Sequence, residues 1–302
     1  MAKIITVFGV TGNQGGSVAR AMITDSKFKV RTAVRDISFP TATEFKQLGA
    51  EVVVADYNDI DSLRKALSGA DGCFIVTNTD FTDPECLHQE IREGKNVADA
   101  CRAEGVKHIA FSTQLSARES VGTEARHMDA KAAIHKYMQN LALPVTGIVV
   151  PFYYENLLGF FKPESVGGNE WRLRIPAIGQ SIFDIISVND VGAIVHSVFL
   201  DPQQFINKTI HPSGDKKKVR EIADILSKHL RPKLITDGQM TYAEFKSLRH
   251  FSGAADIANQ FDFISKKFQC GDMEFTTKLN PGVKNFEQWV IANKDALHRI
   301  CQ

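Results

Sequence analysis

Residues 3–25 read KIITVFGVTGNQGGSVARAMITD, and this stretch decides the fold. Its β-branched and apolar opening, residues 3–9, predicts a buried parallel strand. Apolar residues then recur at helical spacing from 14 to 25, so a helix follows with only a short turn between. The turn is rich in glycine, and the stretch therefore predicts a strand–loop–helix unit.

The turn has the glycine spacing of a dinucleotide-binding loop. One glycine permits a tight turn, a second lets the backbone approach a pyrophosphate, and a third lets the helix pack close to the sheet. The amides at the start of the helix then point at the phosphates, as the helix dipole favours. The alternative is a purely structural turn of an α/β fold. The expected cofactor-binding residues of the loop are Gly9, Val10, Thr11, Gly12, Asn13, Gln14 and Gly15.

The alternation of strand and helix continues through residue 150. Strands are predicted at 3–9, 28–34, 51–56, 71–77, 106–113 and 145–150. This rhythm indicates an α/β fold with a doubly wound parallel sheet of the Rossmann type. Beyond Pro151 the pattern changes to short strands and helices. We therefore predict an NAD(P)-binding Rossmann domain over 1–151 and a smaller α+β region over 152–302 that partly completes the sheet.

The composition excludes several classes of protein. The 302 residues are 43% hydrophobic and 24% charged, as in soluble globular proteins, and the net charge of +1 offers no basic face for direct nucleic-acid binding. No apolar run approaches the roughly 18 residues of a membrane span, and the start lacks the features of a signal peptide. Five scattered cysteines indicate a reducing compartment. We expect a cytoplasmic protein without membrane association, with the nucleus as an alternative location.

The residues after the second predicted strand indicate which nucleotide binds. Arg35 stands 20 residues after Gly15, where NAD sites usually carry an acid. A guanidinium suits a 2′-phosphate through charge-assisted, bidentate hydrogen bonds. NADP(H) is therefore the preferred cofactor. Asp36 keeps NAD(H) open, and Arg35 could instead be an ordinary surface arginine.

Polar residues also end the third and fourth predicted strands, at the sheet edge where such folds bind ligands. Asp56 could accept a hydrogen bond from an adenine amino group. Its alternative role is to cap the next helix, although Asp59 is better placed for that. Thr77, Asn78 and Thr79 follow the fourth strand at the same edge.

With these residues the sequence resembles the NmrA-like family, atypical members of the short-chain dehydrogenase/reductase superfamily. The resemblance spans nearly the whole chain and looks strongest toward the animal members, which are described as NADPH sensors. Fungal NmrA is a transcription co-regulator that binds oxidised dinucleotides. The matching stretches are VFGVTGNQGGSVAR (7–20), TAVRD (32–36), GAEVVVADYND (49–59), FIVTN (74–78), HMDAK (127–131), PFYYENLL (151–158) and FEQWV (286–290).

For the adenosine half of a dinucleotide, the resemblance implies roles for four parts of this chain. Residues 9–15 match the pyrophosphate loop, and Arg35 matches the 2′-phosphate contact. Asp56 and Tyr57 match the adenine side. The chain departs from the family pattern after Arg35, because residues 36–39 carry no second basic side chain. The phosphate would lack one partner, which would weaken the preference for NADP.

For the nicotinamide half, the resemblance implies further contacts. Thr77, Asn78 and Thr79 match the ribose and nicotinamide edge, and Lys131 matches a lysine near the nicotinamide ribose. Arg92 is implied as a further basic contact. The loop over the nicotinamide matches Tyr153, Tyr154, Glu155 and Asn156.

The proton-transfer residue of active short-chain reductases is missing at its usual place. Those enzymes use Tyr-x-x-x-Lys, with both side chains on one helix face. This chain has His127-x-x-x-Lys131, and Tyr137 follows the lysine in the wrong order. His127 is a weak catalytic candidate, since histidine can exchange protons at neutral pH; alternatively it only lines the site. No metal-ligand spacing or Ser/His/Asp arrangement is found.

Two functions compete on these grounds. The first is an NADP(H)-binding redox sensor that acts through a regulatory or metabolic protein partner rather than by catalysis. The second is an NADPH-dependent reductase of quinones or carbonyls, and a scaffold that has lost its cofactor is a third reading. A homodimer remains open. Phe152, Phe160 and Phe161 could form a partner surface or pack the C-terminal region, and Lys216–Lys218 is interpreted as a solvated helix start.

Overall fold

The computed structural model describes residues 2–301 except 178, 180, 249–250 and 268–269. Its chain divides into two compact units. The first comprises Met1–Ser116, Arg126–Val150 and Asn189–Ile210, and the second comprises Ala117–Ala125, Pro151–Val188 and His211–Gln302. This division differs from the contiguous one predicted, because a later segment returns to the first unit and a short earlier one belongs to the second.

The first unit is built on a seven-stranded sheet with the order β11-β6-β5-β4-β1-β2-β3. Every neighbouring pair is parallel, which confirms the predicted α/β fold. The strands are β1 (Lys3–Val7), β2 (Phe28–Val34), β3 (Glu51–Val54), β4 (Gly72–Ile75), β5 (Ile109–Thr113), β6 (Val145–Val149) and β11 (Thr209–Ile210). The order reverses between β1 and β4, where ligands bind in doubly wound sheets.

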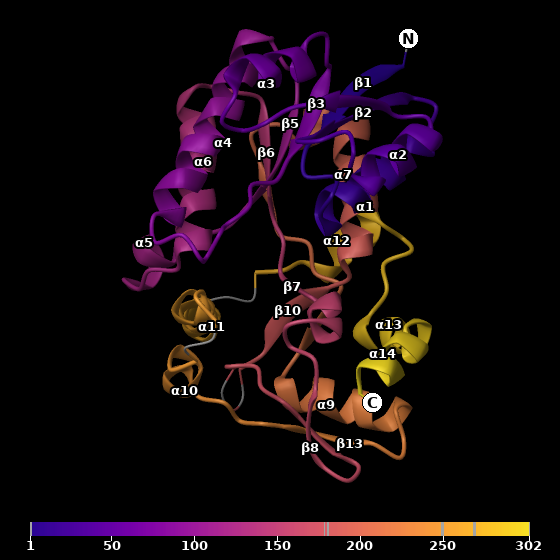
Figure 1. The fold of residues 1–302 in the computed structure, drawn as a ribbon, viewed down its shortest axis with the longest axis vertical. Helices are drawn as coiled ribbons and strands as arrows, with labels where there is room; N and C mark the ends of the chain where they lie inside the picture. Colours follow the sequence, from indigo (N-terminus) through magenta and orange to yellow (C-terminus); the bar gives the residue numbers. More distant parts are fainter. Residues whose placement is uncertain (1, 178, 180, 249–250, 268–269, 302) are drawn as a thin grey trace. The chain divides into compact units, whose positions relative to one another are not determined.

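Helices cover both faces of this sheet (Figure 1). One face carries α1 (Asn13–Ile23), α2 (Pro40–Gln47) and α7 (Val188–Leu200). The other carries α3 (Ile60–Leu67), α4 (Cys86–Ala103) and α6 (Arg126–Asn140), and the short α8 (Pro202–Phe205) follows α7. Within the described residues, no helix combines the length and the apolar character that crossing a bilayer demands.

A close contact explains why α7 belongs to the first unit. A Cβ on Gly192 would lie 2.3 Å from the carbonyl oxygen of Ser17 on α1, so only glycine lets the helices meet there. The Ser17 hydroxyl donates to the Asn189 carbonyl at 3.0 Å and accepts from the Gly192 amide at 3.0 Å. These bonds fix α7 on α1, and the chain beyond it reaches the sheet as β11.

The helices α4 and α6 also approach closely. A Cβ on Gly94 would lie 2.4 Å from two side-chain carbons of Ile134. One turn earlier on α4 stands Glu90, and three residues earlier on α6 stands Lys131. The contact at Gly94 therefore sets the distance between these two charged side chains.

The second unit contains two three-stranded sheets, ordered β12-β10-β7 and β13-β9-β8. Its strands are β7 (Phe152–Tyr153), β8 (Glu164–Gly167), β9 (Glu170–Leu173), β10 (Phe183–Ile186), β12 (Asp215–Lys217) and β13 (Leu234–Asp237). Its helices are α5 (Ala117–Val121), η1 (Tyr154–Leu158), α9 (Val219–His229), α10 (Tyr242–Lys246), α11 (Ala254–Lys267), α12 (Met273–Leu279), α13 (Phe286–Ala292) and α14 (Lys294–Ile300). Phe152 and Phe161 are buried in its core. Phe160 is 54% exposed, but its ring packs against Phe161 and Phe251, so all three phenylalanines pack this unit.

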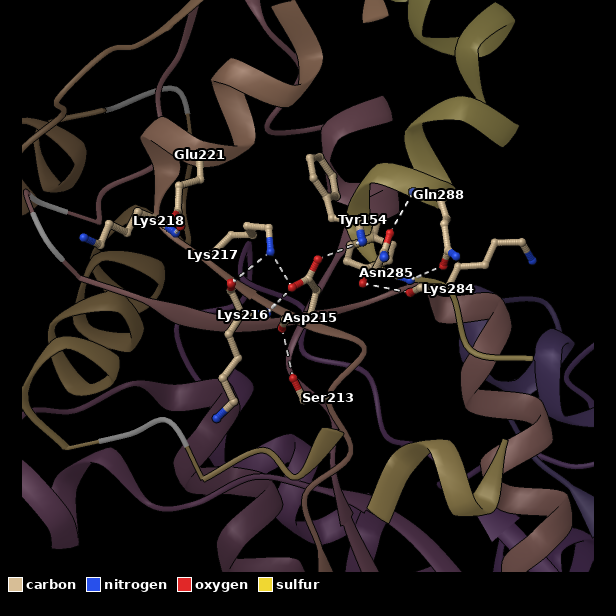
Figure 2. Close-up of polar contacts among 11 residues, drawn as sticks. Tyr154, Ser213, Asp215, Lys216, Lys217, Lys218, Glu221, Lys284, Asn285 and Gln288 are labelled. Carbon is tan, nitrogen blue, oxygen red and sulfur yellow. Dashed lines mark hydrogen bonds and ion pairs between the residues drawn. The ribbon is translucent and has the colours of Figure 1, made fainter. Parts of the chain in front are cut away.

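The buried carboxylate of Asp215 joins β12 to the start of α13 (Figure 2). One oxygen accepts from the Lys216 amide at 2.8 Å and from the Lys217 ammonium at 2.5 Å, and the other accepts from the Phe286 amide at 3.0 Å. Lys216 pairs with Asp184, and the amide of Lys218 donates to Glu221 at the first turn of α9. The lysine run therefore includes a helix start, as interpreted, but two of its ammonium groups are held by carboxylates.

His108, just before β5, is buried in its neutral form. The Thr146 hydroxyl donates to the Phe205 carbonyl at 2.8 Å, so Nε2–H of His108 must donate to the same hydroxyl oxygen, 2.8 Å away. Its Nδ1 has no hydrogen-bond partner among the described residues. Burial is the main reason that the pKa of His108 falls from 6.5 to about 4.

We predict that Gly94→Ala lowers the free energy of unfolding by about 1–2 kcal/mol, because overpacking against Ile134 outweighs the gain in helix propensity. Chemical denaturation measures the change. Combining it with Ile134→Ala should give a loss smaller than the sum of the single losses. An increase in stability for Gly94→Ala alone would contradict the close contact.

We predict that His108 makes folding stability sensitive to acid. The folded-state pKa is depressed, so the stability it contributes is present above pH 6.5 and is lost as pH falls toward 4. The loss should reach about 3 kcal/mol relative to His108→Phe, which does not titrate. Denaturation curves at pH 7.5 and 4 measure it, with the same substitution at the exposed His88 as a control. Equal acid sensitivity of wild type and His108→Phe would refute the assignment.

Candidate functional site

The glycine loop after β1 is folded too tightly for side chains at two positions. Gly9 has a φ of +69°, and a Cβ there would lie 2.6 Å from Cγ1 of Val76. A Cβ on Gly15 would lie 2.4 Å from the carbonyl carbon and oxygen of Gly9. The Gly12 amide donates to the Gly9 carbonyl at 3.0 Å and closes the turn. These contacts bring the start of α1 directly against the end of β1.

Gly12 differs from these glycines, because the chain itself does not exclude a side chain there. Its backbone is extended, with a φ of −98° and a ψ of 169°, and a Cβ would meet only the Gly9 oxygen at 3.4 Å. Thr11, Gly12 and Asn13 are exposed, and the first turn of α1 has neither a side-chain cap nor an acidic residue. The free amides and the helix dipole fit an anion such as a pyrophosphate.

The two charged residues after β2 have different surroundings. Arg35 is exposed and has neither an ion pair nor a hydrogen bond within the described parts of the chain. Asp36 accepts a hydrogen bond from the Ser38 amide at 2.8 Å, and this bond lowers the pKa of its carboxyl group. Asp36 is therefore engaged in its own turn, while the Arg35 guanidinium is available for a phosphate.

The side chains of Asp56 and Tyr57, after β3, both form hydrogen bonds within the first unit, and their role toward an adenine stays a prediction. Asp56 accepts from the Asn58 amide at 2.8 Å, and Asp59 caps α3, as expected for that residue. The Tyr57 hydroxyl donates to the Val76 carbonyl at 3.0 Å, and its ring stacks on Phe8. Burial raises the pKa of Tyr57 well above 10. Tyr57 thus links the ends of β3 and β4, and its phenol is not suited to proton exchange.

A buried carboxylate, Glu90 on α4, connects the end of β4 to α6. Its side chain is 1% exposed and lies 2.6 Å from the Lys131 ammonium, which is 13% exposed. The Thr77 hydroxyl donates to one of its oxygens at 2.5 Å, and the Thr79 hydroxyl donates to the other. Lys131 also donates to Thr79 at 3.3 Å. The structure therefore brings the predicted residues Thr77, Thr79 and Lys131 together around a residue that the sequence analysis missed.

The sequence of α4 contains a pattern from which Glu90 could have been predicted as a buried residue. The buried stripe of α4 runs through Cys86, Glu90, Gly94, Val97 and Cys101 at helical spacing, and Glu90 is its only charged member. A carboxylate within such a stripe is rarely buried without a cationic or hydrogen-bonding partner. The stripe could therefore have marked Glu90 as the partner of Lys131.

The other predicted residues of this half have separate positions. His127 lies one turn before Lys131 on α6, with its ring edge-on to Phe81 at 5.5 Å between centroids. Asn78 is exposed at the end of β4. Arg92 is also exposed, and it lies about 200° around α4 from Glu90. The structure does not bring Arg92 to the lysine.

Tyr137 cannot replace the missing tyrosine. Its hydroxyl donates to Asp99 of α4 at 2.9 Å, and this bond raises the pKa of Tyr137. The phenol is therefore held between α4 and α6, and it is not hydrogen-bonded to Lys131.

The predicted loop Tyr153, Tyr154, Glu155 and Asn156 lies in the second unit. Tyr154 is buried and donates to the Lys284 carbonyl at 3.1 Å, as Figure 2 shows. Tyr153 and Asn156 are half-buried. The Glu155 carboxylate accepts hydrogen bonds from Ser187, Val188 and Trp289. Tyr154 and Glu155 stabilise their own unit, and the role of all four toward a cofactor stays a prediction.

Comparison with known families identifies the chain. Residues 1–290 match the NmrA-like family. The chain belongs to the NmrA-like family. An NmrA-like family domain-containing oxidoreductase of Aspergillus japonicus, himF, is 34% identical over 230 residues, covering 70% of this chain and 69% of that one. An NmrA-like family domain-containing protein of Dictyostelium discoideum is 29% identical over 238 residues, covering 76% and 78%.

Solved structures share the fold of this NmrA-like protein. NmrA, a negative transcriptional regulator, in complex with NAD superposes with a TM-score of 0.81 and 19% identity, covering 95% of this chain and 94% of that one. The same regulator in complex with NADP gives a TM-score of 0.79 at 18% identity, and the match covers 95% of this chain and 94% of that one. The Citrobacter sp. triphenylmethane reductase complexed with NADP(H) gives a TM-score of 0.78 at 22% identity. That match covers 96% of this chain and 99% of the reductase.

We predict that alanine at the two loop positions has opposite consequences. Gly12→Ala should leave the free energy of unfolding within about 0.5 kcal/mol of wild type but weaken NADPH binding, because the added methyl would occupy the exposed space at the start of α1 that a close-lying pyrophosphate needs. Gly15→Ala should cost at least about 2 kcal/mol of stability, because its Cβ meets backbone. Thermal denaturation and calorimetric titration separate the effects. Normal NADPH affinity in folded Gly12→Ala would contradict this picture of the loop.

Proposed function

We propose that this protein binds NADP(H) in its first unit, with NAD(H) as a weaker ligand. The observation that carries the proposal is the exposed Arg35, which has no ion pair or hydrogen bond among the described residues, together with a helix start that only glycines allow to form. The amides in the first turn of α1, from Asn13 on, would hold the pyrophosphate, and Arg35 would hold the 2′-phosphate. Thr77, Thr79 and Lys131 would face the other ribose. Structural neighbours named with NAD or NADP support this reading.

We propose further that binding serves regulation rather than catalysis. The helix position of the usual tyrosine holds His127, and the Tyr137 hydroxyl is bonded to Asp99. The Lys131 ammonium is paired with Glu90, and among the described residues its hydrogen bonds go to Glu90 and Thr79 rather than to a phenol. A sensor needs only that the dinucleotide binds two states of the protein with different affinity. A regulatory or metabolic protein partner, and a homodimer, belong to this proposal.

The second candidate is an NADPH-dependent reductase of quinones or carbonyls. It is favoured by the relatives named as oxidoreductases and by the fold shared with a triphenylmethane reductase. A bound NADPH would supply a hydride, and the chain would need only to hold the substrate in line with it. His127 would be the proton donor to test.

One pair of measurements separates the two functions. Calorimetry gives the NADPH affinity, and NADPH oxidation is followed with quinones, aldehydes and cationic dyes. Tight binding without turnover supports the sensor. Turnover above about 1 s⁻¹, ordinary for enzymes, supports the reductase. No binding of either dinucleotide would overturn both.

We predict that Arg35→Ala weakens NADPH binding about 10- to 100-fold and leaves NADH binding nearly unchanged, because only NADPH carries the 2′-phosphate. Lys29→Ala is the matched control, since it removes an exposed positive charge from the other end of β2. Calorimetric titration with both nucleotides measures the effect. If Arg35→Ala weakened both equally, the guanidinium would not be the 2′-phosphate contact.

A further inference from the structure

Glu90 and Lys131 form a largely buried ion pair. The two side chains are 1% and 13% exposed and meet at 2.6 Å, so their charges cancel within the site. The hydroxyls of Thr77 and Thr79 bind both carboxylate oxygens and fix their orientation. The lysine therefore presents an ammonium whose charge is compensated.

The fold gives this pair a defined place relative to a bound dinucleotide, and this step rests on the proposed function. The two halves of a dinucleotide lie on either side of the strand-order reversal between β1 and β4. Arg35 marks the side of β2 as the one for the 2′-phosphate. The nicotinamide half then belongs to the side of β4 and β5, where Thr77, Thr79 and Lys131 meet Glu90.

The nicotinamide ring changes its charge when the cofactor is reduced. The oxidised ring carries one positive charge, and the reduced ring is neutral. An uncompensated ammonium would repel only the oxidised ring. For unit charges about 8 Å apart and an effective dielectric constant of about 20–40, the repulsion corresponds to roughly a 5- to 30-fold loss of affinity.

We propose that Glu90 sets the preference of the site between the oxidised and the reduced dinucleotide. By compensating Lys131, Glu90 removes a penalty that would fall on NADP⁺ alone. The ratio of the dissociation constants for NADP⁺ and NADPH then depends on the Glu90 carboxylate. Glu90 is thus a specificity-determining residue, acting through Lys131 rather than by touching the reacting atoms.

Glu90→Gln is the decisive variant, because it removes the charge and keeps the shape. A glutamine can still bond both threonine hydroxyls, since each hydroxyl can rotate to donate or accept. Calorimetry with NADP⁺ and NADPH gives the ratio of the two dissociation constants. We expect Kd(NADP⁺)/Kd(NADPH) to rise about 5- to 30-fold over wild type. In Glu90→Gln/Lys131→Gln the charge balance is restored, and the ratio should return to within about twofold of wild type.

Two controls exclude a merely structural effect. Asp99→Asn changes a carboxylate on the same helix that binds Tyr137 and not Lys131, so it should leave the ratio unchanged. Adenosine 2′,5′-bisphosphate lacks the nicotinamide half, so Glu90→Gln should bind it like wild type. A damaged fold would weaken this ligand too, and the second substitution would not reverse the damage.

The outcomes distinguish this inference from the proposed function. Wild-type protein that binds neither NADPH nor adenosine 2′,5′-bisphosphate would overturn the proposed function. Wild-type binding with an unchanged ratio in folded Glu90→Gln would overturn the role of Glu90 alone. If Glu90→Gln does not fold, Lys131→Gln replaces it as the test. This variant removes the positive charge and leaves the Glu90 charge uncompensated, so the expected change in Kd(NADP⁺)/Kd(NADPH) is in the opposite direction. Its ratio must then fall below wild type, and an unchanged ratio refutes the proposal.

Discussion

The contact between Gly15 and the carbonyl of Gly9 is the constraint on which the first unit depends. It lets the backbone of α1 lie against the turn after β1, so the helix amides point to the carboxyl edge of the sheet. From that position Ser17 reaches α7, and α7 brings β11 to the sheet. The absence of a side chain at Gly15 thus decides both where α1 begins and how the far edge of the sheet is completed.

The other half of the site is organised by charge. The close approach of α4 and α6 at Gly94 leaves room for Lys131 and Glu90 to meet one turn away. Without its partner each buried charge would carry a large desolvation penalty, so the pair and the threonine hydroxyls form one unit. The contact between α4 and α6 therefore also decides the charge balance around Lys131.

Much of the fold and of the candidate site could be predicted from local sequence patterns. The six strands through residue 150, the glycine turn and the positions of Arg35 and Lys131 follow from periodicity and motif spacing, because each depends on neighbouring residues. Glu90 was missed since its partner Lys131 is 41 residues away in the sequence, and the two meet only where α4 packs on α6. The return of residues 189–210 to the first unit was also beyond local pattern, because it depends on the meeting of Ser17 and Gly192 in space.

The position of residues 189–210 in the first unit has a consequence for folding during synthesis. The first unit needs three separated stretches, the last of which ends at Ile210. While the ribosome is still making residues 151–188, the β6 edge has no neighbour and the α7-facing surface of α1 is uncovered. A fragment ending near residue 151 would keep both surfaces permanently and expose a strand edge to aggregation. Truncation designed from the nucleotide-binding motif alone would thus remove part of the domain it was meant to isolate.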